Sequence, residues 1–277
     1  MTAAWHAAWL LLLVPACFHP SYDHPACGPG GACPDGLTCN AQGICEAAGS
    51  PTSDAPVAIA DAAIDASVPS FCDIAAPNVI ACYQFEGDTT DGSPHHLDAT
   101  MTNVAFAVGK VGKAMQFGAT SVADAPDSPA LDVAALTIEA WINPSQLPSS
   151  GNRAGIADVN GQYGLFLRSG GDLSCTVNGG PGVPVAKALV ATNRWTHVAC
   201  TYDGVAAAVI YADGIALVTA NGNGSLNTSG NTGLSLAADN PTGSNGKLIG
   251  MIDEVRLLSV ARTAAEICSD AGKLSCP

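Results

Sequence analysis

The chain has 277 residues, a formal net charge of −14 and only 10 Lys or Arg residues. So few cations provide no basic surface that could follow a phosphate backbone, which excludes a nucleic-acid partner. Charged residues make up 12% of the chain and 30 residues are Gly. This composition favours packed sheets joined by tight turns over a helical bundle.

Residues 1–17 are predicted to be a signal peptide. The apolar run from Ala7 to Ala16 is too short to span a bilayer, which takes about 20 residues. The end of this segment, "VPAC", resembles a bacterial lipobox, so we expect Cys17 to carry a lipid, with plain secretion as the alternative. No other stretch is long enough to cross a membrane. The expected location is therefore the cell surface or outer membrane through a lipid anchor, and otherwise secreted or periplasmic.

Residues 18–46 form a small cysteine-rich segment. Its four cysteines are spaced six residues apart: Cys27, Cys33, Cys39 and Cys45. Zinc ligands usually lie two to four residues apart, so this spacing favours two disulfides over a metal site. If Cys17 is lipidated, 10 of the 11 cysteines remain. An even number suits five disulfides formed in an oxidising compartment.

Residues 47–70 are rich in Ala, Asp, Pro and Ser and contain no aromatic residue. Such a segment cannot bury enough apolar area to order itself, so we predict a disordered linker. It would hold the following domain away from the membrane.

Residues 71–277 show the alternation typical of strands. In "LTIEAWINP" every second residue from Leu136 to Ile142 is apolar, whereas Thr137, Glu139 and Trp141 alternate with them. The Asp-Gly pairs at 203–204 and 213–214 predict hairpin turns. Only the segment from Thr263 to Ala271 resembles a helix, with Thr263 as its cap and Glu266 three residues later. These features predict an all-β, two-sheet antiparallel sandwich.

Four phrases carry a family resemblance: "TIEAWINP", "RWTHVACTYDG", "VIYADGIAL" and "GKLIGMIDEVRLLSVARTAAEI". They occur in the order seen in laminin-G-like jelly rolls of the concanavalin A-like lectin/glucanase superfamily. The resemblance covers about Val79 to Ile267 and implies a jelly-roll sandwich. Lectins, adhesion modules, glycosidases and spacers share this fold, so it does not by itself select a function.

The resemblance also implies a structural calcium ion, which family members hold between the first loop and the last strand. Asp88 and Asp91 match positions of that loop, and Asp253 matches the Asp of the terminal strand. Calcium takes several oxygen ligands from carboxylates and carbonyls. The alternative is that Asp88 and Asp91 are ordinary turn residues and that Asp253 accepts backbone hydrogen bonds.

The sequence does not favour catalysis. Glycosidases of this fold place their carboxylates on one strand as Glu-x-Asp-x-x-Glu, whereas Asp253 and Glu254 are adjacent and should point to opposite faces. "TIEAW" offers only Glu139. His197, within the framework phrase "WTHVA", is expected to be a hydrogen-bonded packing residue.

A sugar site needs an aromatic platform with polar groups around it. The candidates are Tyr163, Arg168 and Trp141, although Trp141 lies in a framework phrase and core packing is the alternative. The function we expect is a non-enzymatic cell-surface binding or display module whose partner is a glycan or a surface protein. The alternatives are a disulfide-stabilised structural module without a small ligand and a glycoside hydrolase-like protein with a degenerate site.

The remaining cysteines extend the disulfide hypothesis. The resemblance implies a bridge between Cys175 and Cys200, whose strands lie near each other in this family. Four further cysteines lie near the ends of the domain: Cys72, Cys82, Cys268 and Cys276. Both local bridges and bridges between the two ends remain open.

Overall fold

The computed structural model describes residues 27, 32–33, 37–39, 45–47, 71–72, 76, 78–178, 185–187, 190–221, 224–228, 232–239 and 246–276. The predicted signal peptide, Cys17 and almost all of the predicted linker lie outside these residues. The chain forms two units, residues 1–66 and residues 67–277. Each unit is described by itself. Within the described residues, no helix has the length and apolar character needed to cross a bilayer.

The described residues of the first unit include an antiparallel pair of short strands, β1 (Leu37–Cys39) and β2 (Cys45–Ala47). Two interleaved disulfides crosslink it, Cys27–Cys39 and Cys33–Cys45. Because the four sulfurs are bonded in two pairs, none is free to bind zinc. Crosslinks of this kind order a segment that has too few apolar residues for a core.

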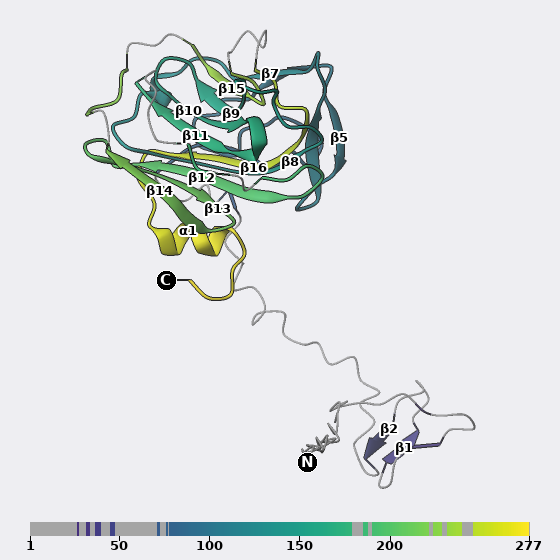
Figure 1. Cartoon of the computed structure of the whole chain (residues 1–277). Coiled ribbons are helices and arrows are strands. Elements are labelled where there is room, and N and C mark those ends of the chain that lie inside the picture. The colour runs from purple at the N-terminus through teal and green to yellow at the C-terminus, as the bar shows by residue number, and fades with distance from the viewer. Residues whose placement is uncertain are drawn as a thin grey trace, which may run out of the picture. The chain divides into compact units, whose positions relative to one another are not determined.

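The second unit is a sandwich of two antiparallel sheets, which Figure 1 shows as two layers of strands. The larger sheet has the order β14-β13-β12-β8-β16-β6-β5, with β3 also paired to β16. Its strands are β3 (Val79–Tyr83), β5 (Ala105–Val108), β6 (Lys113–Phe117), β8 (Leu136–Pro144), β12 (Thr196–Tyr202), β13 (Ala207–Ala212), β14 (Ile215–Asn221) and β16 (Gly250–Leu258).

The smaller sheet has the order β11-β10-β9-β15-β7-β4. Its strands are β4 (Thr100–Thr102), β7 (Val122–Asp124), β9 (Arg153–Val159), β10 (Tyr163–Arg168), β11 (Leu173–Val177) and β15 (Leu234–Leu236). The predicted all-β, two-sheet sandwich is therefore confirmed.

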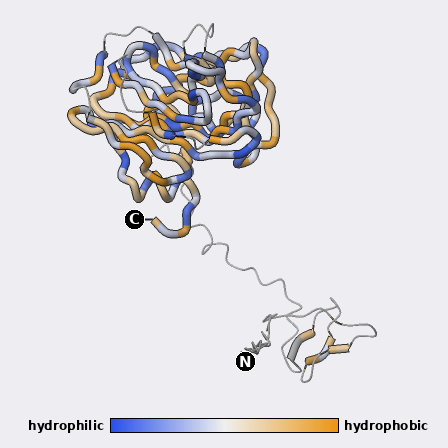
Figure 2. The backbone as a smooth tube through the Cα atoms, in the orientation of Figure 1, coloured by the Kyte–Doolittle hydropathy of each residue, from blue (hydrophilic) through white to orange (hydrophobic). Residues whose placement is uncertain are grey.

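The core lies between the sheets and follows the alternation predicted for β8. Leu136, Ile138, Ala140 and Ile142 are buried in the main hydrophobic cluster. Figure 2 shows hydrophobic residues concentrated along the strands of this unit. A disulfide joins Cys175 of β11 to Cys200 of β12 and so links the two sheets through the core.

Helix α1 (Ala264–Asp270) covers part of the outer face of the larger sheet. Ile267 packs against Ala199 and Tyr211. Thr263 and Glu266 form a reciprocal capping box, which starts the helix where the sequence predicts. The helix thereby encloses the polar side chains that alternate with the core residues of β8.

Candidate functional site

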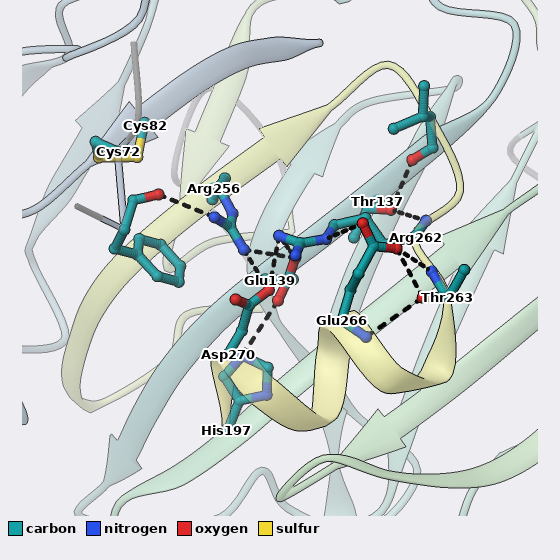
Figure 3. A network of polar contacts seen from close by, with 12 residues as sticks. Cys72, Cys82, Thr137, Glu139, His197, Arg256, Arg262, Thr263, Glu266 and Asp270 are labelled. Atoms are coloured by element: carbon teal, nitrogen blue, oxygen red, sulfur yellow. Dashed lines mark hydrogen bonds and ion pairs between the residues drawn. A yellow bond between two sulfur atoms is a disulfide. The ribbon is translucent and has the colours of Figure 1, made fainter. Parts of the chain in front are cut away.

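The outer face of the larger sheet carries a buried ion-pair network centred on Glu139 (Figure 3). Glu139 of β8 lies opposite Arg256 of β16. His197 of β12 lies opposite Trp141, which is two residues from Glu139 along β8. The Arg256 NH2 nitrogen is 3.1 Å from Glu139 Oε1, and His197 Nε2 is 3.4 Å from Oε2. The Glu139 and His197 side chains are fully buried.

Helix α1 and the segment before it complete this network. Asp270 Oδ2 is 2.5 Å from Arg256 NH2 and 2.6 Å from Arg262 NH1. Arg262 NH1 is also 3.5 Å from Glu139 Oε1. Two guanidinium groups thus face the carboxylates of Glu139 and Asp270, and Arg262 Nε also lies 3.9 Å from the exposed carboxylate of Glu266. Each enclosed charge therefore has a partner of opposite sign.

The two carboxyl groups titrate differently. Burial alone would raise the pKa of Glu139, but the adjacent His197 side chain and the charges of Arg256 and Arg262 outweigh it and lower the pKa. Burial, with the charge of Glu139 second, raises the pKa of Asp270 to about 6. Glu139 therefore carries the more persistent negative charge and holds the arginines in place.

Arg256 also binds Phe71, near the N-terminal end of the sandwich unit. Its NH1 group donates a hydrogen bond to the Phe71 carbonyl at 2.9 Å, and its guanidinium lies 4.2 Å from the Phe71 ring centroid. The Cys72–Cys82 disulfide fastens the same segment to β3. One arginine thus connects the first described residues of the unit with its last helix, and we assign Glu139 and Arg256 a structural role.

Beside the network lies a surface groove of about 750 Å³, which we call the helix groove. It combines aromatic, amide and charged side chains, and its lining includes Phe71, Asn78, Gln84, Trp141, Glu254 and Arg262. Trp141 is 9% exposed. The Lys110 ammonium lies 4.4 Å from the Trp141 ring centroid, and the His197 ring meets it edge-on at 5.3 Å.

Glu254 reaches this groove because β16 contains a bulge between Asp253 and Arg256. Its backbone has a φ of +49°, a left-handed conformation that strains a non-glycine residue. The residue is 2% exposed, and its Oε2 accepts no hydrogen bond from the described residues. Burial first, and then the charge of Asp253, raise the pKa of Glu254 to about 7. The bulge overturns the simple alternation expected for this pair.

The three carboxylates predicted to bind calcium accept backbone hydrogen bonds. Asp88 accepts from Thr90 N, and Asp91 accepts from the backbone N–H groups of Cys82, Ser93 and Leu97. Asp253 accepts from those of Lys110, Val111 and Glu254.

N–H donors compete with a cation for the same oxygens. Across the described ranges, the only group of three metal-ligating side-chain atoms consists of disulfide-bonded cysteines. The geometry of Asp88, Asp91 and Asp253 therefore does not fit a shared cation site, and the calcium ion that the resemblance implies remains untested.

The three predicted sugar-binding residues do not meet. Tyr163 is 2% exposed, belongs to the core between the sheets, and donates its hydroxyl hydrogen to the Leu131 carbonyl at 2.8 Å. Its inward direction on β10 removes it as a stacking platform, which corrects its assignment as a ligand-binding residue. Trp141 lies in the helix groove, and Arg168 lies on the other sheet.

Arg168 lines a second groove, of about 850 Å³, which we call the basic groove. Its charged residues are Arg153, Arg168, Lys247 and Asp239, and its polar residues include Ser149 and Asn152. The sequence pattern singles out Arg168 alone. Arg153 lies on the neighbouring strand β9, whereas Asp239 and Lys247 follow much later in the chain, and no local motif predicts that these residues converge.

The disulfides at the ends of the sandwich unit are local. They join Cys72 to Cys82 and Cys268 to Cys276, at sequence separations of 10 and 8. This pairing resolves the choice that spacing left open. The two ends of the unit are joined by the Arg256 network and not by a covalent bridge.

Residues 117–268 match the sequence profile of the concanavalin A-like lectin/glucanases superfamily. A comparison with curated protein sequences found no match. Several solved structures share the fold. Domain 4 of an extracellular arabinanase from Geobacillus stearothermophilus, solved with arabinotriose, is 21% identical with a TM-score of 0.56, over 71% of this chain and 98% of that one.

Two toxin domains are similar over about half of their own length. The binding domain of Paraclostridial Mosquitocidal Protein 1 is 14% identical with a TM-score of 0.56, over 73% of this chain and 52% of that one. The binding domain of Botulinum Neurotoxin DC, solved with SialylT, is 13% identical with a TM-score of 0.52, over 74% and 53%. At these identities the likeness establishes the fold.

Proposed function

Because this chain belongs to the concanavalin A-like lectin/glucanases superfamily, we propose that its sandwich is a non-enzymatic module that binds a glycan at the cell surface. The observation that carries this proposal is the composition of the helix groove. An indole ring, a glutamine amide and a buried carboxylate line one surface depression, from Trp141, Gln84 and Glu254. Sugars are recognised by flat apolar rings together with a few directed polar groups.

The chemistry of the individual groups agrees with this role. Glu254 Oε2 is buried and lacks a hydrogen-bond donor among the described residues, so a rotation of this side chain toward the groove would let it accept one from a sugar hydroxyl. The Gln84 side chain is hydrogen-bonded to the Glu254 carboxyl group, and its remaining amide donor and its carbonyl acceptor can bind sugar hydroxyls. Lys110 lies over the Trp141 ring and is exposed, so a sugar face can replace it at little cost. The arabinanase domain solved with arabinotriose and the neurotoxin domain solved with SialylT support a glycan as the partner.

The geometry of the carboxylates supports a binding role over catalysis. Glu139, the one acidic residue in "TIEAW", is enclosed by two arginines and His197, so a substrate cannot reach it. Asp270 is paired with the same two arginines. The carboxylates nearest Glu254, those of Asp253 and Glu86, accept backbone hydrogen bonds, so Glu254 lacks the free partner carboxylate that glycoside hydrolysis requires.

A glycan array probed with the disulfide-intact protein tests the binding role. Binding to a defined glycan is expected to fall at least tenfold in Gln84→Ala and Trp141→Ala. Trp141 packs against His197, so Trp141→Ala can also weaken the fold. Gln84→Ala therefore tests the loss of a glycan contact more directly. Lys187→Ala, whose side chain is 83% exposed, is the matched control and should bind as the parent does. Equal binding by Gln84→Ala and the parent would refute this site, and absence of all glycan binding would favour the structural module.

The hydrolase alternative has one favourable observation, the pKa of about 7 at Glu254, which suits a general acid. Reducing-sugar release by the parent protein, abolished in Glu254→Gln or Glu139→Gln, would replace the binding proposal with that one. We expect no release from any of the three proteins.

We further propose that the protein is exported and anchored through a lipid on Cys17. Its five disulfides support an oxidising compartment. Mass spectrometry of the mature N-terminus should find a diacylglyceryl-modified Cys17 as the first residue. An unmodified Cys17, or cleavage at another residue, would contradict the anchor.

A further inference from the structure

We propose that the basic groove is a second binding site, separate from the helix groove, and that it takes the carboxylate of an acidic sugar. The first observation is its charge. The chain has 10 Lys and Arg residues against 24 Asp and Glu, yet Arg153, Arg168 and Lys247 all line this groove. The only acidic residue lining it, within the described part of the chain, is Asp239. The lining therefore carries a net charge of +2 on a strongly acidic protein.

The second observation is the register of two strands. Arg153 of β9 lies directly opposite Arg168 of β10 in the antiparallel pair. Side chains opposite each other share one face of a sheet, with Cβ atoms about 5 Å apart, and like charges in this position destabilise the pair. A cross-strand pair of arginines thus costs folding stability, and an anion placed between them would relieve the repulsion.

Asp239 neutralises only one member of the pair. Arg153 donates from Nε and NH2 to the two Asp239 oxygens, each at 2.6 Å, and its guanidinium lies 3.9 Å from the Phe166 ring centroid. Arg168 lines the groove and is only partly exposed, and it makes no ion pair or side-chain hydrogen bond with any described residue. Its planar guanidinium is free to bind a carboxylate through two parallel hydrogen bonds.

The other groups favour a sugar carboxylate over a bare anion. Lys247 donates to the Ser121 carbonyl at 2.6 Å, which fixes its ammonium at the groove and leaves it further donors. Asn152 donates to Ser149 Oγ at 2.6 Å, so both polar side chains are held in place on the same lining. They can bind sugar hydroxyls beside the charged group. Charges are screened beyond about 8 Å at physiological salt. Of the nearer carboxyl groups, Asp124 interacts with Lys247 and Asp158 with Arg153, which leaves Arg168 as the uncompensated cation of the groove.

The experiment compares acidic oligosaccharides with their neutral methyl esters. Trigalacturonate, a hyaluronan hexasaccharide and a sialylated trisaccharide are titrated calorimetrically into the full-length parent protein, each as the free acid and as the ester. We expect at least one acid to bind, and to bind at least tenfold more tightly than its ester. Failure of all three acids to bind, or equal binding of an acid and its ester, would overturn the proposal.

Variants locate the site and separate it from the helix groove. Arg168→Ala should weaken binding of the acid at least tenfold, Arg168→Lys should restore part of it, and Lys187→Ala and Gln84→Ala should leave it unchanged. Because Arg168→Ala removes a like-charge neighbour and no partner, its melting temperature should equal or exceed that of the parent. Unchanged binding in Arg168→Ala would refute the site, as would inorganic phosphate competing at the same concentration as the sugar acid.

Discussion

The Arg256 NH2 nitrogen lies 3.1 Å from Glu139 Oε1, and both side chains are almost completely enclosed. Removing one partner of a buried pair leaves the other charge uncompensated, at a cost of about 3–5 kcal/mol. Arg256→Met keeps a similar apolar length but exposes Glu139 and Asp270 to each other. We expect its unfolding free energy, measured by urea denaturation, to fall by about that amount.

The exposed pair formed by Arg194 and Asp213 provides the comparison. Its atoms are 2.6 Å apart, but the side chains are 56% and 28% exposed. Solvent screens such pairs, which are worth about 0–1 kcal/mol. Arg194→Met should therefore change stability by less than about 1 kcal/mol. A similar small loss in Arg256→Met would show that the network contributes little.

Stability should decrease as the pH rises from about 4 toward 7. Burial first, and then the charge of Asp239, raise the pKa of Asp158 from 3.8 to about 7. In this interval the folded protein holds a proton that the unfolded chain has released, so the unfolding free energy falls with increasing pH. Each pKa unit corresponds to about 1.4 kcal/mol, so the loss is on the order of a few kcal/mol.

Asp158→Asn removes that titration, and denaturation at several pH values should show a flatter profile than in the parent. Glu254, whose pKa is also about 7, contributes in the same direction and should preserve part of the slope. The double variant with Glu254→Gln should flatten it further. An unchanged slope in Asp158→Asn would contradict the assignment.

Among the disulfides of the sandwich unit, Cys175–Cys200 should contribute most to the free energy of unfolding. It closes a loop at a separation of 25 residues, against 8 for Cys268–Cys276. Crosslinks restrict the unfolded chain more as the loop grows, which predicts a loss of about 3–4 kcal/mol when both cysteines become alanine. The double substitution at Cys268 and Cys276 should cost less. The reverse order in thermal melts would refute this ranking.

The elements of the sandwich could be predicted because their signals are local. The period of two in β8 separates core residues from Glu139 and Trp141, and Thr263 with Glu266 marks the start of α1. The candidate sites could not be predicted in the same way. Arg256 and Glu139 are separated by 117 residues, and only the pairing of β8 with β16 brings them together.

For two residues, Tyr163 and Glu254, the predicted role depended on the face of the sheet to which the side chain points. Tyr163 alternates with Gly164 on β10, and its register places the ring in the core, which composition alone does not reveal. The bulge after Asp253 turns Glu254 toward the helix groove against the expected alternation. The position of a bulge depends on how the strand pairs with its neighbours, so it cannot be predicted from the residues of the bulge alone.

Removal of calcium should leave the melting temperature unchanged to within about 1 °C, because the carboxylates expected to bind it already accept backbone N–H groups. Asp253 is the decisive residue, since it accepts from Lys110, Val111 and Glu254 and so ties the loop before β6 to β16. Asp253→Asn replaces an ionised acceptor and should lower stability by about 1–3 kcal/mol.

If the loss of stability in Asp253→Asn comes from these backbone hydrogen bonds, it will be the same in EGTA and in millimolar calcium. Differential scanning calorimetry of the parent and Asp253→Asn under both conditions decides the matter. A calcium-dependent rise in the parent that disappears in the variant would establish a cation at this position and overturn the hydrogen-bonding explanation.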